Sequence, residues 1–160
     1  MTPEEIRCQV VVADSSERIG RVVLSPRDVD LETGYPKENF ITLRLDEDGI
    51  SFLRIDYLGE EVFLQKCKER EQLYNRKKKK QSFVGWMEAK VGEIVSIDPE
   101  RIFPDIPEPV KAPEHLLIKF RTDGEAVRGI VTDALVLDLM DEIFHCLKYE
   151  QALQEDGVMT

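Results

Sequence analysis

The fold of this chain is decided by residues 40–56, which run FITLRLDEDGISFLRID. Two apolar runs flank a short acidic segment that ends in Gly49, and such polar, glycine-containing segments are typical of tight turns. We therefore predict a β-hairpin with these paired residues: Leu45 with Ile50, Leu43 with Phe52, and Ile41 with Arg54. Because both faces of the hairpin carry apolar side chains, we expect it to lie in the centre of a sheet.

Two arginines, Arg44 and Arg54, interrupt these apolar runs on opposite faces of the predicted hairpin. An arginine removed from water needs a carboxylate or an anionic ligand as its partner. Asp56 lies two residues from Arg54 on the same strand face. Two interpretations stay open for Arg44, Arg54 and Asp56: an internal ion pair, or a clamp for an anionic substrate.

On the N-terminal side, residues 6–13 and 19–24 are rich in valine and isoleucine and predict a second β-hairpin. The capping-box spacing from Thr2 to Glu5 favours the alternative of a short helix over residues 3–9 followed by one strand. An irregular loop is expected over residues 25–39, because they contain Pro26, Gly34 and Pro36.

On the C-terminal side, residues 60–76 contain helix formers with a narrow apolar stripe and predict a mostly solvated helix. Apolar side chains then alternate over residues 83–97, which predicts one long bent strand with bulge points at Gly85 and Gly92. Residues 98–114 hold five of the eight prolines and predict an extended arm.

The last part of the chain predicts a hairpin and a helix. Residues 116–120 and 126–131 flank Asp123 and Gly124, a strong turn signal. Asp133 can cap a helix that runs to about residue 152 and packs across the sheet, and residues 153–160 are expected to fray. The sequence therefore predicts a single α+β domain over residues 1–160, with a largely antiparallel sheet of about five to seven strands, a C-terminal helix on one face and a second, mostly solvated helix.

Composition is that of an ordinary folded domain, since 42% of the 160 residues are hydrophobic and 34% are charged. The first residues lack a signal-peptide pattern, and no apolar run approaches the roughly 20 residues that a membrane span needs. The three cysteines lie far apart, at positions 8, 67 and 146, as in proteins of a reducing compartment. We expect a cytoplasmic protein without membrane contact. The net charge of −10 disfavours a generic polyanion binder but permits a local basic site.

The most conspicuous motif is a run of five cations that begins two residues after Tyr74: Arg76, Lys77, Lys78, Lys79 and Lys80. A cationic run beside an aromatic ring can contact nucleic acid, because the cations attract phosphates and the ring can stack on a base. It can equally contact an acidic protein, or form a solvated helix end.

Three apolar residues of the proline-rich arm, Ile102, Phe103 and Ile106, are spaced for docking on a partner protein. The alternative is that they pack on the core of their own chain.

The sequence predicts no catalytic, cofactor-binding or metal-ligating residue. It contains no GxSxG, GxGxxG or HExxH motif and no CxxC pair. A calcium loop starting at Asp46 would need a glutamate where Tyr57 stands. Cys67 and Cys146 are expected to be inert side chains.

Three functions remain open from the sequence. The leading hypothesis is a small acidic accessory protein, antitoxin-like, that acts through contacts with another protein of unknown identity. The first alternative is a nucleic-acid-binding protein that uses residues 76–80. The second alternative is an enzyme whose small anionic substrate is clamped by Arg44 and Arg54. The oligomeric state is left open.

Overall fold

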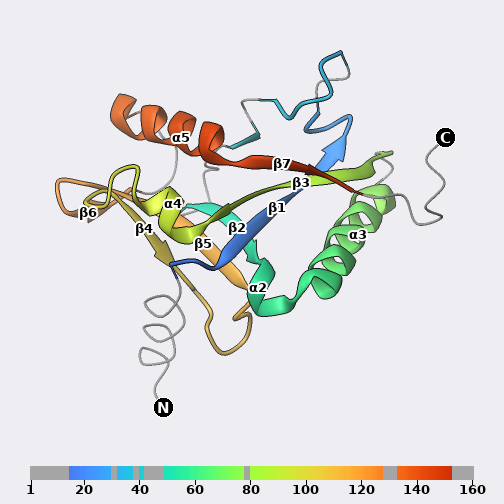
Figure 1. The fold of residues 1–160 in the computed structure, drawn as a ribbon, viewed down its shortest axis with the longest axis horizontal. Coiled ribbons are helices and arrows are strands. Elements are labelled where there is room, and N and C mark those ends of the chain that lie inside the picture. Colours follow the sequence, from blue (N-terminus) through green and yellow to red (C-terminus); the bar gives the residue numbers. More distant parts are fainter. Residues whose placement is uncertain are drawn as a thin grey trace.

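The computed structural model describes residues 15–29, 32–37, 40–41, 49–77, 80–127 and 133–152. Within these ranges, an antiparallel sheet of seven strands is flanked by four helices (Figure 1), which confirms the predicted α+β class. The elements are β1 (Arg18–Ser25), β2 (Ile50–Arg54), α2 (Ile55–Leu58), α3 (Glu60–Arg76), β3 (Ser82–Lys90), α4 (Val91–Val95), β4 (Ile102–Asp105), β5 (His115–Thr122), β6 (Glu125–Ala126), α5 (Ala134–Cys146) and β7 (Lys148–Gln151). No helix among these residues is long and apolar enough to cross a membrane.

The strand order is β4-β5-β2-β1-β3-β7, with β6 paired to β5. β2 has a strand on each side, β1 and β5, as its two apolar faces predict. The ladder between β1 and β2 is short, however. It consists of Ile19 opposite Arg54 and Gly20 opposite Leu53. From Arg21 onward β1 pairs with β3 but not with β2, so β1 and β2 separate partway along their length.

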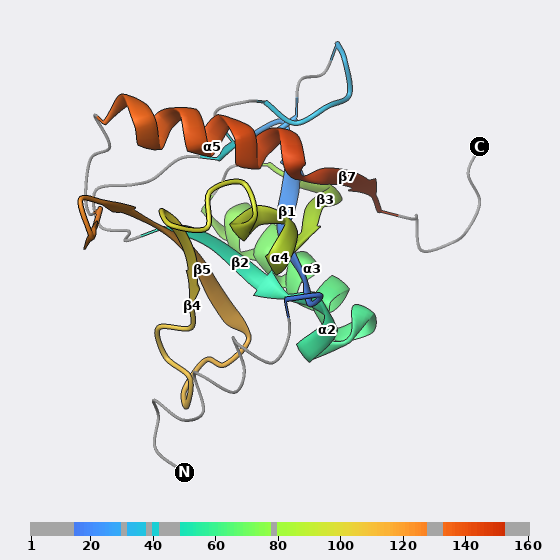
Figure 2. The ribbon, with the colours of Figure 1, turned by 60° about the vertical axis from the view of Figure 1, so that its left-hand side comes forward.

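One face of the sheet carries the main core, which α4 and α5 cover (Figures 1 and 2). α5 begins where the sequence predicts, because the Asp133 carboxylate accepts hydrogen bonds from the backbone N–H groups of Leu135 and Val136. Its inward stripe packs on the strands and consists of Val136, Leu139, Met140 and Ile143. The predicted packing of this helix across the sheet is confirmed.

The opposite face of the sheet carries α2 and α3. α3 has the predicted bounds, and it buries only Phe63 and Cys67. The Phe63 ring meets the Trp86 indole edge-on, with the ring centroids 5.8 Å apart. Because the remaining side chains of α3 are wholly or partly exposed, the prediction of a mostly solvated helix is confirmed.

Two predicted elements have different bounds in the structure. The long strand expected over residues 83–97 ends at Lys90, and α4 follows it. The side chain of Glu93 accepts a hydrogen bond from the Lys90 backbone N–H and caps the helix. The helix predicted to reach residue 152 ends at Cys146, because residues 148–151 form β7 on the free side of β3.

The proline-rich arm also contains regular structure that the sequence prediction missed. Residues 102–105 form β4, which pairs with β5 at the edge of the sheet. Pro104 is tolerated there because an edge strand does not need every backbone N–H for its ladder.

The hairpin of β5 and β6 turns at Asp123 and Gly124, as predicted. Several other predictions fall outside the described residues: the elements at 3–9 and 6–13, the segment 42–45 of the central hairpin, residues 128–131, and the tail at 153–160. Phe40 and Ile41 are described; both are buried, and neither belongs to a strand.

Candidate anion-binding cleft

A cleft of about 370 Å³ lies where β1 and β2 part, under the C-terminal half of α3. Strand residues such as Gly20, Val22 and Leu53 line one side, and residues 66–74 of α3 line the other. The cleft follows from the short ladder between the two strands. α3 is anchored near its N-terminal half by Phe63 and Cys67 and has no buried residue beyond them.

Cations predominate among the ionisable side chains that line this cleft. They are Arg21, Arg27, Lys66 and Arg70, against the single carboxylate of Glu69 among the described lining residues. Lys66 and Arg70 are one helical turn apart and therefore project from the same face of α3. Neither of these two cations is ion-paired with any residue in the described part of the chain. Such a concentration of positive charge contrasts with the net charge of −10 of the whole chain.

Arg21 is held in position at the point where the two strands separate. Its guanidinium Nη1 donates a 2.9 Å hydrogen bond to the backbone oxygen of Ser51 in β2. The same guanidinium lies 5.1 Å from the centroid of the Phe40 ring. Arg21 therefore bridges the two strands beyond the end of their ladder and brings a fixed positive charge into the cleft.

Arg27 joins the cleft to the basic run of the sequence. Its guanidinium lies over the Tyr74 ring, 4.6 Å from the centroid. Its backbone N–H donates to the side chain of Gln81 (3.0 Å), and the backbone N–H of Gln81 donates to the side chain of Asn75 (2.8 Å). Asn75 in α3 and Gln81 just before β3 are thereby linked to the turn at Arg27.

This arrangement places part of the predicted basic segment next to the cleft. Tyr74 lines the cleft, and Arg76, Lys77 and Lys80 are exposed beside Asn75 and Gln81. Lys78 and Lys79 lie outside the described residues.

The turn that presents Arg27 is stabilised by Asp28. The Asp28 carboxylate is 6% exposed and accepts a 3.0 Å hydrogen bond from the backbone N–H of Leu24. Burial raises the pKa of Asp28 above its usual range; the Leu24 hydrogen bond and the charge of Arg27 oppose this shift without cancelling it.

The floor of the cleft contains Cys67, and His115 lines it as well. Burial raises the pKa of the Cys67 thiol to about 12, so the thiol is protonated and a poor nucleophile at neutral pH. No hydrogen bond between Cys67 and His115 is formed in the described structure. No group of three or more His, Cys, Asp or Glu residues in the described ranges could hold a metal ion.

Arg54 lies outside the cleft, in an internal ion pair. Its Nε and Nη2 atoms are 2.6 and 3.2 Å from the two carboxylate oxygens of Glu17, and its Nη1 donates to the Pro113 backbone oxygen at 2.8 Å. The ion-pair interpretation of Arg54 is therefore correct, but its partner is Glu17 instead of Asp56. The clamp interpretation is wrong for Arg54, because all three nitrogens are already engaged. Arg44 lies outside the described residues.

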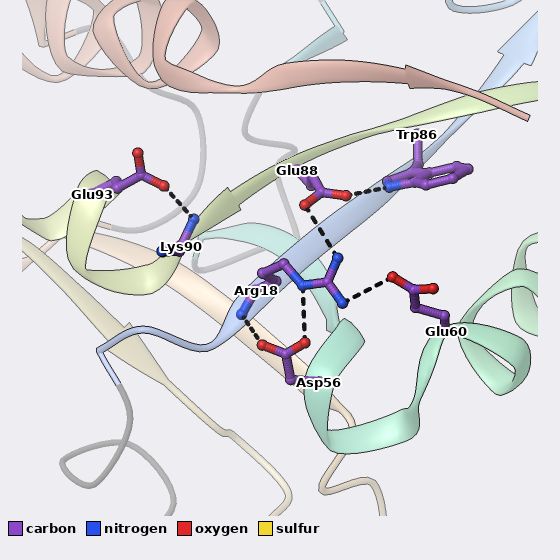
Figure 3. A network of polar contacts seen from close by, with 7 residues as sticks. All are labelled: Arg18, Asp56, Glu60, Trp86, Glu88, Lys90 and Glu93. Carbon is purple, nitrogen blue, oxygen red and sulfur yellow. Dashed lines mark hydrogen bonds and ion pairs between the residues drawn. The ribbon is translucent and has the colours of Figure 1, made fainter.

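Asp56 is engaged by Arg18 (Figure 3). The Arg18 guanidinium is surrounded by Asp56 (2.9 Å), Glu60 (3.1 Å) and Glu88 (3.7 Å). Glu88 also accepts a 2.7 Å hydrogen bond from the Trp86 indole N–H. Burial acts to raise the pKa of Asp56, but the hydrogen bonds from the Arg18 backbone and side chain outweigh it, and the net pKa is lowered. This network ties β1 and β3 to α2 and to the start of α3.

The three arm residues predicted as a docking surface are not a free apolar patch. Ile102 and Ile106 are 1% and 0% exposed and belong to the main core. Phe103 is half-buried, and the Arg121 guanidinium lies over its ring, 4.0 Å from the ring centroid. The alternative of packing on the chain's own core is the correct one for Ile102 and Ile106.

The basic run can be recognised in the sequence, whereas the cations of the cleft cannot. Lys66 and Arg70 carry a weak signal, since two cations at i and i+4 on a solvated helix share a face. Arg21 and Arg27 carry no such signal in the sequence, because their approach to α3 depends on tertiary structure. Comparison of the chain with protein-family models, curated proteins and solved structures found no match.

Proposed function

We propose that this protein binds single-stranded nucleic acid in the cleft under α3 and along the basic segment of residues 76–80. The observation that carries the proposal is the convergence of four cations on one cavity, continuous through Arg27 and Tyr74 with a cationic segment. Proteins that bind single strands combine a positively charged groove with aromatic side chains on which bases stack.

The shape of the cleft favours a single strand over a duplex. A volume of about 370 Å³ is at the lower end of the range for small-molecule pockets, so we propose that a single unstacked nucleotide enters it. A base also needs apolar and aromatic surface, and Leu53, Leu73 and Tyr74 supply it beside the cations.

The negative charge of the whole chain does not oppose binding at short range. At physiological ionic strength, exposed charges more than about 8 Å apart are largely screened from each other. A phosphate inside the cleft therefore experiences chiefly Lys66, Arg70 and their neighbours. The distant carboxylates act instead on the rate of approach and weaken non-specific binding.

Fluorescence anisotropy with labelled single-stranded and duplex oligonucleotides, RNA and DNA, tests the proposal. Single strands should bind more tightly than duplexes of the same sequence. The double variant Lys66→Gln, Arg70→Gln should lose most of this affinity. Lys68→Gln is the matched control, since Lys68 is on the same helix but does not line the cleft. Absence of binding at low salt, or an equal loss in the control, would reject the proposal.

The basic segment is tested through the salt dependence of binding. Replacing Lys77 to Lys80 with glutamine removes cations that would neutralise phosphates. For single strands, each lost phosphate contact should flatten the slope of log affinity against log salt by about 0.7. An unchanged slope would remove this segment from the binding surface.

A second candidate function is contact with another protein, as expected of an accessory or antitoxin-like chain. The favouring observation is that Tyr35 and Val110, which are 67% and 69% exposed, present apolar surface on an acidic molecule. Affinity purification from the native host, followed by light scattering, tests it. A strictly monomeric protein that elutes without a partner would count against this function.

A further inference from the structure

We infer that the outer edge of β7 pairs with β7 of a second copy of this chain, antiparallel and in one register, so that the two sheets join into one. β7 is the last strand in the order β4-β5-β2-β1-β3-β7, and in the described part of the chain no strand lies on its side away from β3 (Figure 1). Such an edge offers backbone donors and acceptors to another strand. The inference is independent of nucleic-acid binding, because β7 does not line the cleft.

The backbone of β7 shows which residues face outward. The N–H of Ala152 donates to the Val84 oxygen (2.9 Å), and the register with β3 continues without a shift to residue 148. Because the hydrogen-bonding direction alternates along a strand, the even-numbered residues of 148–152 direct their backbone groups towards β3. Tyr149 and Gln151 direct theirs away from it. Among the described residues, no hydrogen bond reaches these outward groups.

Two charged side chains of β7 lie beside this edge. Lys148 and Glu150 are exposed, and neither forms an ion pair with another residue of the described ranges. They are two residues apart and therefore lie on the same face of the strand. A second strand that pairs with β7 would bring its own side chains opposite these two charges.

The charges select one register. The outward groups of two copies can meet only if a residue of β7 lies on the two-fold axis. With the axis at Tyr149, Lys148 of each copy lies opposite Glu150 of the other, and the two Tyr149 residues exchange backbone hydrogen bonds. With the axis at position 148 or 150, two lysines or two glutamates would lie directly opposite each other, which is unfavourable. β7 is thus self-complementary in charge only around Tyr149.

The dimer is expected to be weak. β7 has four residues, Lys148–Gln151, so the paired edges bury less area than a standard protein interface. Each copy also carries a net charge of −10, which opposes association at long range. The fraction of dimer should therefore rise with protein concentration over the range in which monomer and dimer exchange.

Sedimentation velocity over a series of protein concentrations tests the inference. The wild type should shift from monomer to dimer as concentration rises. Lys148→Glu and Glu150→Lys each place like charges opposite each other at two positions, and each should raise the dissociation constant by at least about tenfold. An equimolar mixture of the two variants should dimerise about as well as the wild type, because every opposed position again pairs a lysine with a glutamate.

Two control variants separate pairing at β7 from other causes. Lys111→Glu changes the net charge as Lys148→Glu does, at an exposed position between β4 and β5, and should leave dimerisation almost unchanged. Gln151→Pro removes an outward N–H without touching the ladder to β3 and should weaken the dimer, whereas Gln151→Ala should not. Circular dichroism checks that each variant is folded.

Three results would overturn the inference. The first is a wild type that stays monomeric at every concentration. The second is a dimer that neither charge reversal weakens. The third is a mixture of the two reversed variants that dimerises no better than either variant alone. None of these results bears on the affinity of the cleft for oligonucleotides, so the proposed function stands or falls separately.

Discussion

Arg54 and Glu17 form a two-point ion pair inside the molecule, with the Arg54 Nε 2.6 Å from one Glu17 oxygen and both residues no more than 5% exposed. The pair joins the turn before β1 to the end of β2. The third nitrogen of the guanidinium reaches Pro113, just before β5. Three segments distant in the sequence therefore depend on one guanidinium.

Replacing Glu17 with glutamine should destabilise the protein strongly. Breaking a buried pair by removing one charge costs about 3–5 kcal/mol, because the other charge stays desolvated without a counter-charge. Urea denaturation of the wild type and Glu17→Gln measures the difference. Arg101→Gln is the control, since the pair of Arg101 with Asp98 is partly exposed and should contribute less than about 1 kcal/mol. Equal losses in both variants would contradict a sealed pair.

Asp28→Asn and Asp56→Asn should change stability in opposite directions as pH changes. The pKa of Asp28 is raised in the folded state above its ordinary value of 3.8. Its contribution to the free energy of unfolding therefore falls as pH rises from 3.8 through the pKa of the folded state. An asparagine keeps an oxygen to accept the Leu24 hydrogen bond and avoids a buried charge. Asp28→Asn should therefore gain stability relative to wild type at neutral pH and lose that gain in acid.

The pKa of Asp56 is lowered in the folded state below its ordinary value of 3.8. Its stabilising contribution is therefore present above pH 3.8 and is lost as pH falls through the pKa of the folded state. Asp56→Asn should therefore be less stable at neutral pH, by under about 1 kcal/mol since the pair with Arg18 is partly exposed. The deficit should disappear in acid. Thermal unfolding across this pH range measures the stability of both variants relative to wild type. If both variants were stabilised, or both destabilised, at neutral pH, the opposite pKa shifts of Asp28 and Asp56 would be refuted.

Cys67 should resist alkylation in the folded protein. With its pKa raised to about 12, the thiolate fraction at pH 8 is about a thousandfold smaller than for an ordinary thiol of pKa 9.0. Iodoacetamide labelling followed by peptide mass spectrometry should show Cys146, which is half-buried, modified before Cys67. Denatured protein should label at both positions alike. Rapid native labelling of Cys67 would show that the floor of the cleft opens to solvent.

Gly85→Ala should detach β7 from the edge of the sheet. A Cβ at position 85 would clash with the backbone oxygen of Glu150 and would lie 2.7 Å from the Tyr149 ring. Because the closest atom is backbone, β7 must move as a whole. Hydrogen exchange should become faster in residues 148–151, while α3 keeps its protection. Unchanged exchange in β7 would show that the strand can shift without breaking its ladder.

The elements whose sequence carried its own boundary signals were predicted well. α3 lacks internal glycine and proline, α5 is capped by Asp133, and the turn of β5 and β6 is made by Asp123 and Gly124. Misplaced boundaries arose where tertiary pairing decided the outcome. Residues 148–151 could extend a helix by local propensity, but the open side of β3 makes them a strand.

The candidate site was predicted only in part, for the same physical reason. A run of five cations can be recognised from the sequence alone. The approach of Arg21 and Arg27 to α3, in contrast, requires that β1 and β2 separate in the folded protein. The partner of Arg54 was mistaken because Asp56 is near in sequence, whereas Glu17 becomes near only through the pairing of Ile19 with Arg54.

The brevity of the ladder between β1 and β2 has a mechanical consequence. In the described chain, β2, β4, β5 and β6 form one half of the sheet and β1, β3 and β7 form the other. The links between β2 and β1 with its preceding turn include two residue pairs, the hydrogen bond from Arg21 to Ser51 and the ion pair of Arg54 with Glu17. The sheet therefore has a seam, and the cleft opens onto it. An occupant of the cleft would span the seam and damp twisting of one half against the other, so that occupancy and stiffness of the sheet rise together.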